Sequence, residues 1–175
     1  MRNNDKLQFK AGYGIFFYSL SIPSVSVRNN KTHNYGEVSA VEDSIEKILE
    51  IHEAENDETD LYRQYIIVSD SQYCIKSITQ YMYVWREFGW RRHTGKEIHY
   101  VEKWKHIYEM LKKLDDMEVD IGFLHVRSHL KQPTDINSLE YFLWYGNQCA
   151  DRLATGKTIR PPHPLFNPFL RGDSQ

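Results

Sequence analysis

Apolar residues recur every three or four positions in three long segments of the chain. This spacing predicts amphipathic helices over residues 35–53, 71–85 and 101–114. A fourth, shorter helix is expected over residues 147–154, with Asn147 as its N-cap. The apolar stretch before it, LEYFLWY at residues 139–145, is expected to pack down as part of a long loop.

Shorter runs of β-branched and aromatic residues predict four strands, over residues 12–19, 21–27, 64–68 and 119–126. The first two are expected to form a hairpin at a sheet edge, because Pro23 lies near their turn. The order of strands and helices predicts an α/β fold with a mixed sheet flanked by helices. Sheets of this kind bind their ligands at the carboxyl ends of strands.

The length and composition fit one domain with a sizeable core. The 175 residues divide into a polar leader (1–10), a domain (11–156) and a proline-rich tail (157–175). The chain has no apolar run of about 18 residues and no signal-peptide core, so no membrane partner is expected. Cys74 and Cys149 lack the spacing of a disulfide framework or zinc site. We therefore expect an intracellular monomer of the cytoplasm or nucleus.

Charge is unevenly distributed along the chain, although the net charge is only −2. Residues 42–60 carry nine acidic side chains and one lysine. Residues 85–106 carry six lysines and arginines against three acidic residues. The second segment predicts a local basic patch on a slightly acidic protein.

Three acidic residues stand where their elements are expected to turn inward. Asp70 ends the apolar strand in the sequence IIVSDSQY, Glu37 adjoins the stripe of the first helix, and Asp151 lies in the last helix. Three carboxylates from three elements could converge on hard divalent cations, which prefer oxygen ligands. The alternatives are that Asp70 caps the next helix with the help of Ser71, Asp151 complements a helix dipole and Glu37 lies at a stripe edge.

Several segments, together covering about residues 11–156, resemble the type 1 ribonuclease H family. AGYGIFF resembles its second strand, THNYGEVSAVEDSIEKILE its first helix, and IIVSDSQYCIKSITQYMYVW its central strand and following helix. GWRRHTGKEI resembles its basic handle, LHVRSHL its last strand and histidine loop, and GNQCADRLA its closing Gly-Asn-x-x-Ala-Asp pattern. The order and spacing of these segments argue against coincidence.

The resemblance implies a five-stranded mixed sheet and metal-dependent endonucleolytic cleavage of the RNA strand of RNA–DNA hybrids. It implies Glu37, Asp70 and Asp151 as ligands of two Mg²⁺ ions, which Mn²⁺ could replace. His129 is implied to assist proton transfer or product release, the alternative being a solvated loop histidine.

The resemblance also implies a set of substrate-binding residues: Thr32, Asn34, Ser71, Gln72, Trp85, Trp90, Arg91 and Arg92. Thr32 is implied to hold a DNA phosphate, and Asn34 and Gln72 to read the minor groove, where 2′-hydroxyls distinguish RNA. His33 stands where the family usually has an asparagine. Tyr100 stands where an asparagine often completes the phosphate pocket, which weakens that pocket. The alternative for the handle is a core tryptophan in the 71–85 helix and solvated arginines.

The family begins with a strand that ends in an Asp-Gly-Ser-like sequence, whose Asp bridges both metals. The first ten residues, MRNNDKLQFK, contain no apolar strand, and Asp5 is their only acid. We therefore expect the domain to be truncated by about one central strand and to lack that catalytic Asp. A start-site or fragment explanation is favoured over a decayed copy or a strand from another chain.

Three hypotheses follow from the sequence. The first is an RNA–DNA hybrid ribonuclease, and the second is a catalytically impaired or inactive hybrid-binding module. The third is an exonuclease or integrase built on the same fold. The D-S-Q-Y segment and the basic handle favour the ribonuclease.

Overall fold

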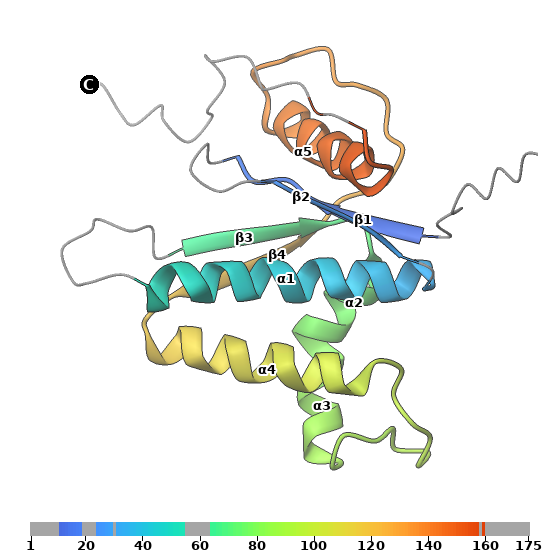
Figure 1. Cartoon of the computed structure of the whole chain (residues 1–175), viewed down its shortest axis with the longest axis vertical. Coiled ribbons are helices and arrows are strands. Elements are labelled where there is room, and N and C mark those ends of the chain that lie inside the picture. The colour runs from blue at the N-terminus through green and yellow to red at the C-terminus, as the bar shows by residue number, and fades with distance from the viewer. Residues whose placement is uncertain (1–10, 19–23, 30, 55–63, 158, 160–175) are drawn as a thin grey trace, which may run out of the picture.

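The computed structural model describes residues 11–18, 24–29, 31–54, 64–157 and 159. Its elements in chain order are β1 (Ala11–Ile15), β2 (Val25–Asn29), α1 (His33–Glu53), β3 (Gln64–Ser69), α2 (Gln72–Lys76), the π-helix η1 (Ser77–Tyr81), α3 (Met82–Glu87), α4 (Val101–Asp116), β4 (Asp120–His125) and α5 (Leu139–Ala154) (Figure 1). The predicted leader and almost all of the predicted tail lie outside these residues.

The described strands form two sheets of two strands each. β1 pairs with β2 in antiparallel register, from Ala11 opposite Asn29 to Ile15 opposite Val25. β3 pairs with β4 in parallel register, ending with Ser69 opposite His125. The mixed α/β class is confirmed, but no strand among the described residues joins β1 to β3. The predicted lack of a first strand stays a prediction, because residues 1–10 are outside the described part of the chain.

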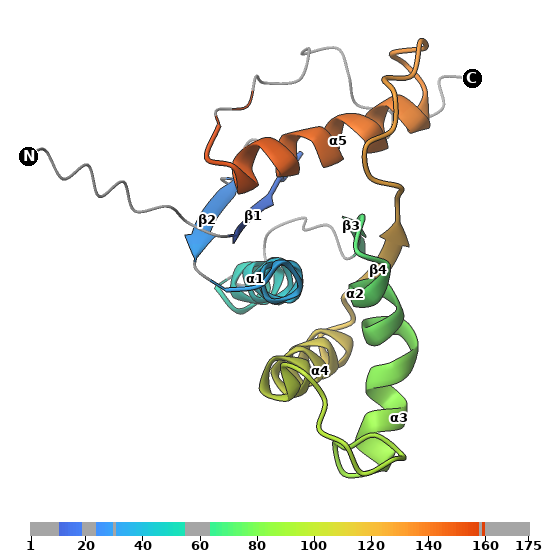
Figure 2. The same cartoon turned by 90° about the vertical axis from the view of Figure 1, so that its right-hand side faces the viewer.

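Helices lie on both sides of the strands. α5 lies over β1 and β2 on one side, and α1 and α4 lie on the other (Figures 1 and 2). The core between α1, α4 and the β3–β4 sheet contains the predicted apolar stripe of α1, which consists of Val38, Val41, Ile45, Ile48 and Leu49. It also contains four residues that are each at most 1% exposed: Ile78, Met82, Trp104 and Ile107. Burial of this apolar surface is the main force that holds these elements together. Among the described residues, no helix is both long and apolar enough to cross a membrane.

The predicted helix over residues 71–85 is interrupted by the π-helical turn η1. The hydroxyl of Thr79 donates to the carbonyl of Ile75 at 2.7 Å beside this turn. A π-turn adds about one residue per turn and often marks a functional site. Ile78 and Met82 remain buried across it, so the apolar face that the sequence predicted is preserved.

The prediction that Asn147 caps the last helix was wrong. α5 begins at Leu139, and the hydroxyl of Ser138 accepts from the backbone N–H of Tyr141 at 3.1 Å, which makes Ser138 the cap. The segment 139–145 is therefore helical rather than a packed loop. Gly146 suggested a helix start, but a Cβ at this position would lie 2.8 Å from the Tyr18 hydroxyl, so this glycine serves packing.

Two glycines of β1 bring α5 close to the strand. A Cβ on Gly14 would lie 2.5 Å from the Cβ of Leu153, and one on Gly12 would lie 2.8 Å from the Val27 carbonyl oxygen and would also clash with the Ala154 carbonyl. Real side chains do not reach such distances. The glycine pair therefore determines how near α5, which carries Asp151, lies to the sheet.

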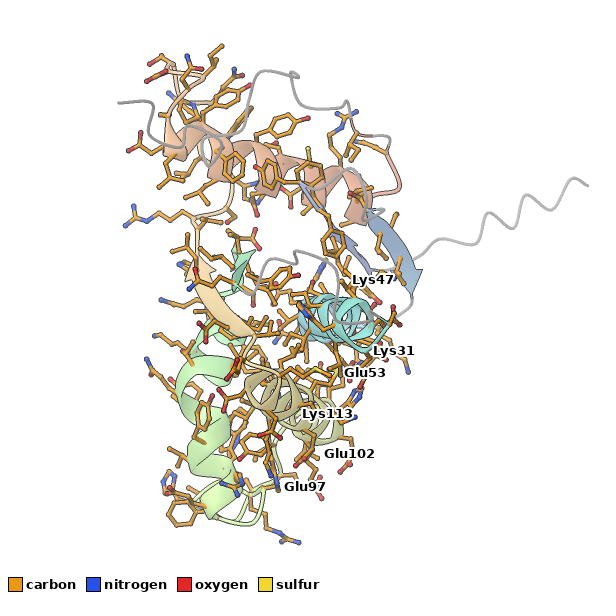
Figure 3. All side chains as sticks on the ribbon, turned by 90° about the vertical axis from the view of Figure 1, so that its left-hand side faces the viewer. Lys31, Lys47, Glu53, Glu97, Glu102 and Lys113 are labelled. Atoms are coloured by element: carbon orange, nitrogen blue, oxygen red, sulfur yellow. The ribbon has the colours of Figure 1, made fainter. Side chains whose placement is uncertain are left out.

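Charged side chains lie on the exposed faces of α1 and α4, as Lys47, Glu53, Glu102 and Lys113 illustrate in Figure 3. Lys113 of α4 lies 4.0 Å from Glu53 of α1, and Lys103 pairs with the partly buried Glu42. An exposed pair such as Lys113 with Glu53 contributes little to stability, on the order of 0–1 kcal/mol. The packing of α1 on α4 therefore rests on the apolar residues between them.

Candidate active site

Asp70 lies in a bend directly after β3, where its side chain is partly buried. The backbone N–H of Ser71 donates to the Ser69 hydroxyl at 3.1 Å, and Nε2 of His125 lies 3.2 Å from the carbonyl oxygen of Asp70. The backbone N–H of Val126 also donates to the Ser69 carbonyl at 3.0 Å. These contacts fix the bend against the end of β4. His125 and Ser69 were not among the predicted site residues, although both stand at strand ends beside them.

Glu37 of α1 approaches this bend through Ser71. The hydroxyl of Ser71 donates to Oε2 of Glu37 at 2.6 Å. The hydroxyl oxygen of Ser71 accepts from the backbone N–H of Cys74 at 3.3 Å, so Ser71 also caps α2. Ser71 is 5% exposed, whereas the neighbouring Gln72 is exposed.

Asp151 of α5 interacts electrostatically with Asp70. Burial raises the pKa of Asp151 above its usual range, the negative charge of Asp70 raises this pKa further, and His129 opposes the shift. Burial also raises the pKa of the Cys74 thiol to about 12, with smaller contributions from Glu37 and Asp70. Asp70 and His129 thus both lie near enough to Asp151 to influence its pKa, and Glu37 and Asp70 both lie near enough to influence that of Cys74.

The donor set fits a divalent cation chemically. Carboxylate oxygens are the ligands that Mg²⁺ prefers, and the repulsion between Asp70 and Asp151 is what a bound cation would offset. No cluster of three histidine, cysteine, aspartate or glutamate side chains in the described part of the chain is compact enough to form a metal site by itself. The carboxylates of the described residues therefore do not form a closed coordination shell by themselves.

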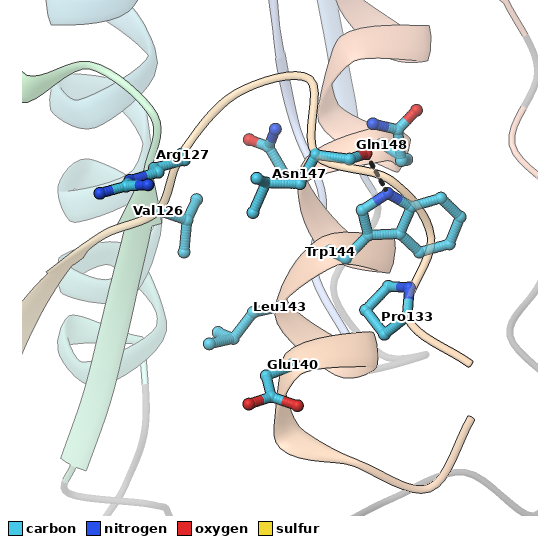
Figure 4. Close-up of a pocket in the computed structure, with 9 residues that line it drawn as sticks. Val126, Arg127, Pro133, Glu140, Leu143, Trp144, Asn147 and Gln148 are labelled. Carbon is cyan, nitrogen blue, oxygen red and sulfur yellow. Dashed lines mark hydrogen bonds between the residues drawn. The ribbon is translucent and has the colours of Figure 1, made fainter. Parts of the chain in front are cut away.

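The loop that carries His129 is attached to α5. The indole N–H of Trp144 donates to the Leu130 carbonyl at 3.0 Å, drawn as a dashed line in Figure 4. An apolar pocket lies between this loop and α5, lined by residues that include Val126, Pro133 and Leu143. His129 itself is exposed and has a positive φ of 56°.

Thr32 and Asn34 lie at the start of α1. The hydroxyl of Thr32 caps α1 by accepting from the backbone N–H of Tyr35 at 3.2 Å, and it lies 2.7 Å from the hydroxyl of Tyr100. Tyr100 therefore lies beside Thr32, where the family resemblance implied an asparagine. Asn34 is exposed in the first turn of α1.

The basic handle lies at the far end of α3 from α2 and the strands (Figure 1). Trp85 is partly buried against Trp104, with ring centroids 6.1 Å apart, so it contributes to the core. Trp90 packs edge-on against Tyr108, and Arg91 and Arg92 are exposed in the loop that follows. The structure therefore separates the handle from the carboxylates.

A family model described as "RNase H" matches residues 2–158. The chain belongs to the ribonuclease H family. Membership confirms the resemblance on which the site residues were chosen. It does not test the role of any single residue.

Curated relatives include viral polyproteins and cellular enzymes. The Pro-Pol polyprotein of feline foamy virus is 28% identical over 147 residues, which is 84% of this chain and 11% of the relative. The ribonuclease H of Methylorubrum extorquens (strain PA1) is 34% identical over 106 residues, covering 55% of this chain and 38% of the relative. This chain thus spans about a tenth of the viral polyprotein and less than half of the bacterial enzyme.

Solved structures of ribonuclease H domains share the fold. The structure titled "Solution structure of PFV RNase H domain" aligns with a TM-score of 0.55 and 29% identity, covering 77% of this chain and 70% of that one. A foamy viral protease–reverse transcriptase solved in complex with an RNA/DNA hybrid also aligns with a TM-score of 0.55. Its identity is 22%, and the alignment covers 86% of this chain and 20% of that one. The likeness confirms the ribonuclease H-like α/β fold.

Proposed function

We propose that this chain is an endoribonuclease that cleaves the RNA strand of RNA–DNA hybrids by two-metal-ion hydrolysis. Two observations support the proposal: Glu37 accepts a hydrogen bond from Ser71, the residue after Asp70, and the charge of Asp70 raises the pKa of Asp151. The relatives named ribonuclease H support the same reaction.

The proposed mechanism assigns the carboxylates to cation binding. Glu37, Asp70 and Asp151 would hold Mg²⁺, or Mn²⁺ in its place. When bound, two such ions activate a water molecule and stabilise the oxygen that leaves the phosphorus. His129, on its exposed loop beside Asp151, would deliver a proton to the leaving 3′-oxygen or assist product release.

We further propose that the hybrid lies across the start of α1, the start of α2 and the handle. Asn34 and Gln72 are exposed and would read the minor groove, where the 2′-hydroxyls mark the RNA strand. Thr32 would contact a DNA phosphate, with Tyr100 beside it. Trp90 and the exposed arginines of the handle would bind the DNA strand, with Trp85 supporting them from the core.

Asp70→Asn tests the proposed reaction, because it keeps the size of the side chain and removes its charge. The wild-type chain is expected to cleave the labelled RNA strand of a hybrid in Mg²⁺, and the variant is expected to lose at least about a hundredfold in rate because the charge that binds the cation is gone. Asp120→Asn is the matched control, since Asp120 is exposed at the opposite end of the β3–β4 sheet. Cleavage that survives Asp70→Asn would contradict the proposal.

A second candidate is a hybrid-binding module without turnover. It is favoured by the open arrangement of the carboxylates, which form no compact metal cluster among the described residues. It predicts salt-dependent hybrid binding without cleavage in either Mg²⁺ or Mn²⁺. Binding and cleavage measured on the same labelled hybrid separate the two candidates.

The remaining proposals concern the state of the protein. We propose that it acts as an intracellular monomer; the two free, buried cysteines favour a reducing compartment. The elution volume of the purified chain measures its oligomeric state directly.

A further inference from the structure

We infer that Ser71 positions the carboxylate of Glu37 for cation binding and does not contact the substrate. The inference rests on the proposed function, because it concerns the same metal centre. It reassigns a residue that the family resemblance places among the substrate contacts.

The hydrogen bonds of Ser71 leave its hydroxyl no proton for a substrate. A serine hydroxyl has one proton to donate and two lone pairs to accept. The proton goes to Oε2 of Glu37 at 2.6 Å, and one lone pair receives the backbone N–H of Cys74 at 3.3 Å. A phosphate oxygen would need that proton, and a 2′-hydroxyl could donate only to the one lone pair that remains. With Ser71 only 5% exposed, the side chain is also shielded from a bound nucleic acid.

The backbone of Ser71 is held as firmly as its side chain. Its N–H donates to the Ser69 hydroxyl at 3.1 Å, and its carbonyl accepts from the N–H of Ile75 at 3.1 Å. The hydroxyl therefore lies at a defined place beside Asp70. Because this hydroxyl donates to Glu37, the end of β3 determines where the Glu37 carboxylate of α1 lies.

Positioning of this kind matters because a glutamate side chain has several rotatable bonds. A hydrogen bond from a neutral donor to a carboxylate is stronger than one between neutral groups, and it selects one rotamer of Glu37. Residues that orient metal ligands typically change metal affinity by about 10- to 100-fold when they are removed. Loss of the Ser71 hydroxyl should therefore weaken cation binding without removing any ligand.

The alternative is that Ser71 only caps α2, and Ser138 provides the matched control. Ser138 caps α5, the helix that carries Asp151, by the same side-chain bond to a backbone N–H. Its hydroxyl donates to the Asp135 carbonyl and contacts no carboxylate of the site. Ser138→Ala therefore removes a cap, as Ser71→Ala does, and leaves the proposed metal ligands alone.

The test is Mn²⁺ binding to the full chain, measured by calorimetry without nucleic acid. Ser71→Ala is expected to weaken Mn²⁺ binding by about tenfold or more, whereas Ser71→Thr, which keeps the hydroxyl, should bind nearly as the wild type does. Ser138→Ala should lower Tm without changing Mn²⁺ affinity. Ser71→Gly gives a second measurement if Ser71→Ala folds poorly, because glycine is an accepted N-cap residue and lacks the hydroxyl.

The outcomes separate the inference from the proposed function. If Ser71→Ala and Ser71→Gly bind Mn²⁺ as Ser138→Ala does, the serine is only a cap and the inference is overturned. If Asp70→Asn binds Mn²⁺ as tightly as the wild type does, the metal centre itself is wrong, and the proposed function fails. Loss of binding in Asp70→Asn together with tenfold weakening in Ser71→Ala supports both.

Discussion

Negative charge dominates the candidate site at the scale of single residues. Burial and the charge of Asp70 both raise the pKa of Asp151, which means that the ionised pair is costly without a cation. Ser71 donates to the carboxylate of Glu37, and Nε2 of His125 contacts the backbone carbonyl of Asp70. The residues that stabilise the site thus hold its geometry and leave most of its charge uncompensated.

Asp151→Asn is expected to stabilise the metal-free chain at neutral pH. Because the pKa of Asp151 is raised in the folded state, the folded chain binds more protons than the unfolded chain as pH rises above the ordinary value of 3.8. Stability is therefore lost as pH rises through this window, and an uncharged asparagine avoids that loss. Tm measured with a chelator should be higher for the variant at pH 7, and this advantage should vanish below about pH 3.8, where the wild-type carboxyl is protonated.

In Mg²⁺ the wild-type chain should have the higher Tm, because a bound cation stabilises the wild-type chain and not the Asp151→Asn variant. Asp120→Asn, which changes an exposed carboxylate, should leave Tm unchanged in both conditions. A lower Tm for metal-free Asp151→Asn at pH 7 would show that the charge of Asp151 is compensated by another group.

At the scale of elements, close packing between β1 and α5 determines where α5 lies relative to the strands. Gly12 and Gly14 of β1 face the last turns of α5, and Gly146 of α5 accommodates Tyr18, whose ring stacks on Phe142 with centroids 3.7 Å apart. α5 then carries Asp151 to the region of Asp70. The position of Asp151, a proposed metal ligand, thus depends on three glycines.

Gly14→Ala is expected to destabilise the chain by about 2 kcal/mol or more, because the added methyl group would overlap Leu153 and the α5 backbone. Gly122→Ala is the matched control in a strand, since a Cβ there would meet its nearest atom at an ordinary 3.6 Å. Urea unfolding monitored by tryptophan fluorescence measures both changes. Equal losses for the two variants would show that α5 does not pack on β1 as described.

Opposite charges occupy different parts of the surface at the scale of the whole molecule. Exposed Arg91, Arg92 and Lys96 lie in the loop after α3, whereas α1 carries much of the acidic segment. This separation places the positive charge at the far end of α3 from the strands (Figure 1). A polyanion would therefore be attracted to the handle and repelled by the acidic part of α1.

Arg91→Ala and Arg92→Ala are each expected to weaken hybrid binding and to reduce the slope of log K against log salt by about 1, because each removes one phosphate contact. Lys113→Ala is the control, because Lys113 is equally exposed but lies on α4 beside Glu53. Fluorescence anisotropy over a range of salt concentrations gives the slopes. An unchanged slope in both arginine variants would show that these arginines do not contact the hybrid.

Local pattern alone predicted most of the elements. The apolar stripe of α1, the bounds of α4 at Val101 and of β3 at Gln64, and the burial of Ile78 and Met82 all match the structure. Helical and strand periodicity reflect which face meets the core, so a single sequence carries that information. The apolar run of β3 also predicted that Asp70 follows the end of a strand, as it does in the structure. The family match confirms the resemblance of this segment, and the role of Asp70 stays a prediction.

Tertiary contacts decided the rest. Asn147 and Gly146 favour a helix start by local propensity, but the packing of Gly146 against Tyr18 and the cap at Ser138 place the start at Leu139. The bond from Ser71 to Glu37 joins residues 34 positions apart, so no local pattern could show it. The sequence by itself determined which residues carry charge and which face inward. Only the folded chain decided which of these residues contact one another, as Ser71 contacts Glu37, because such contacts join elements far apart in sequence.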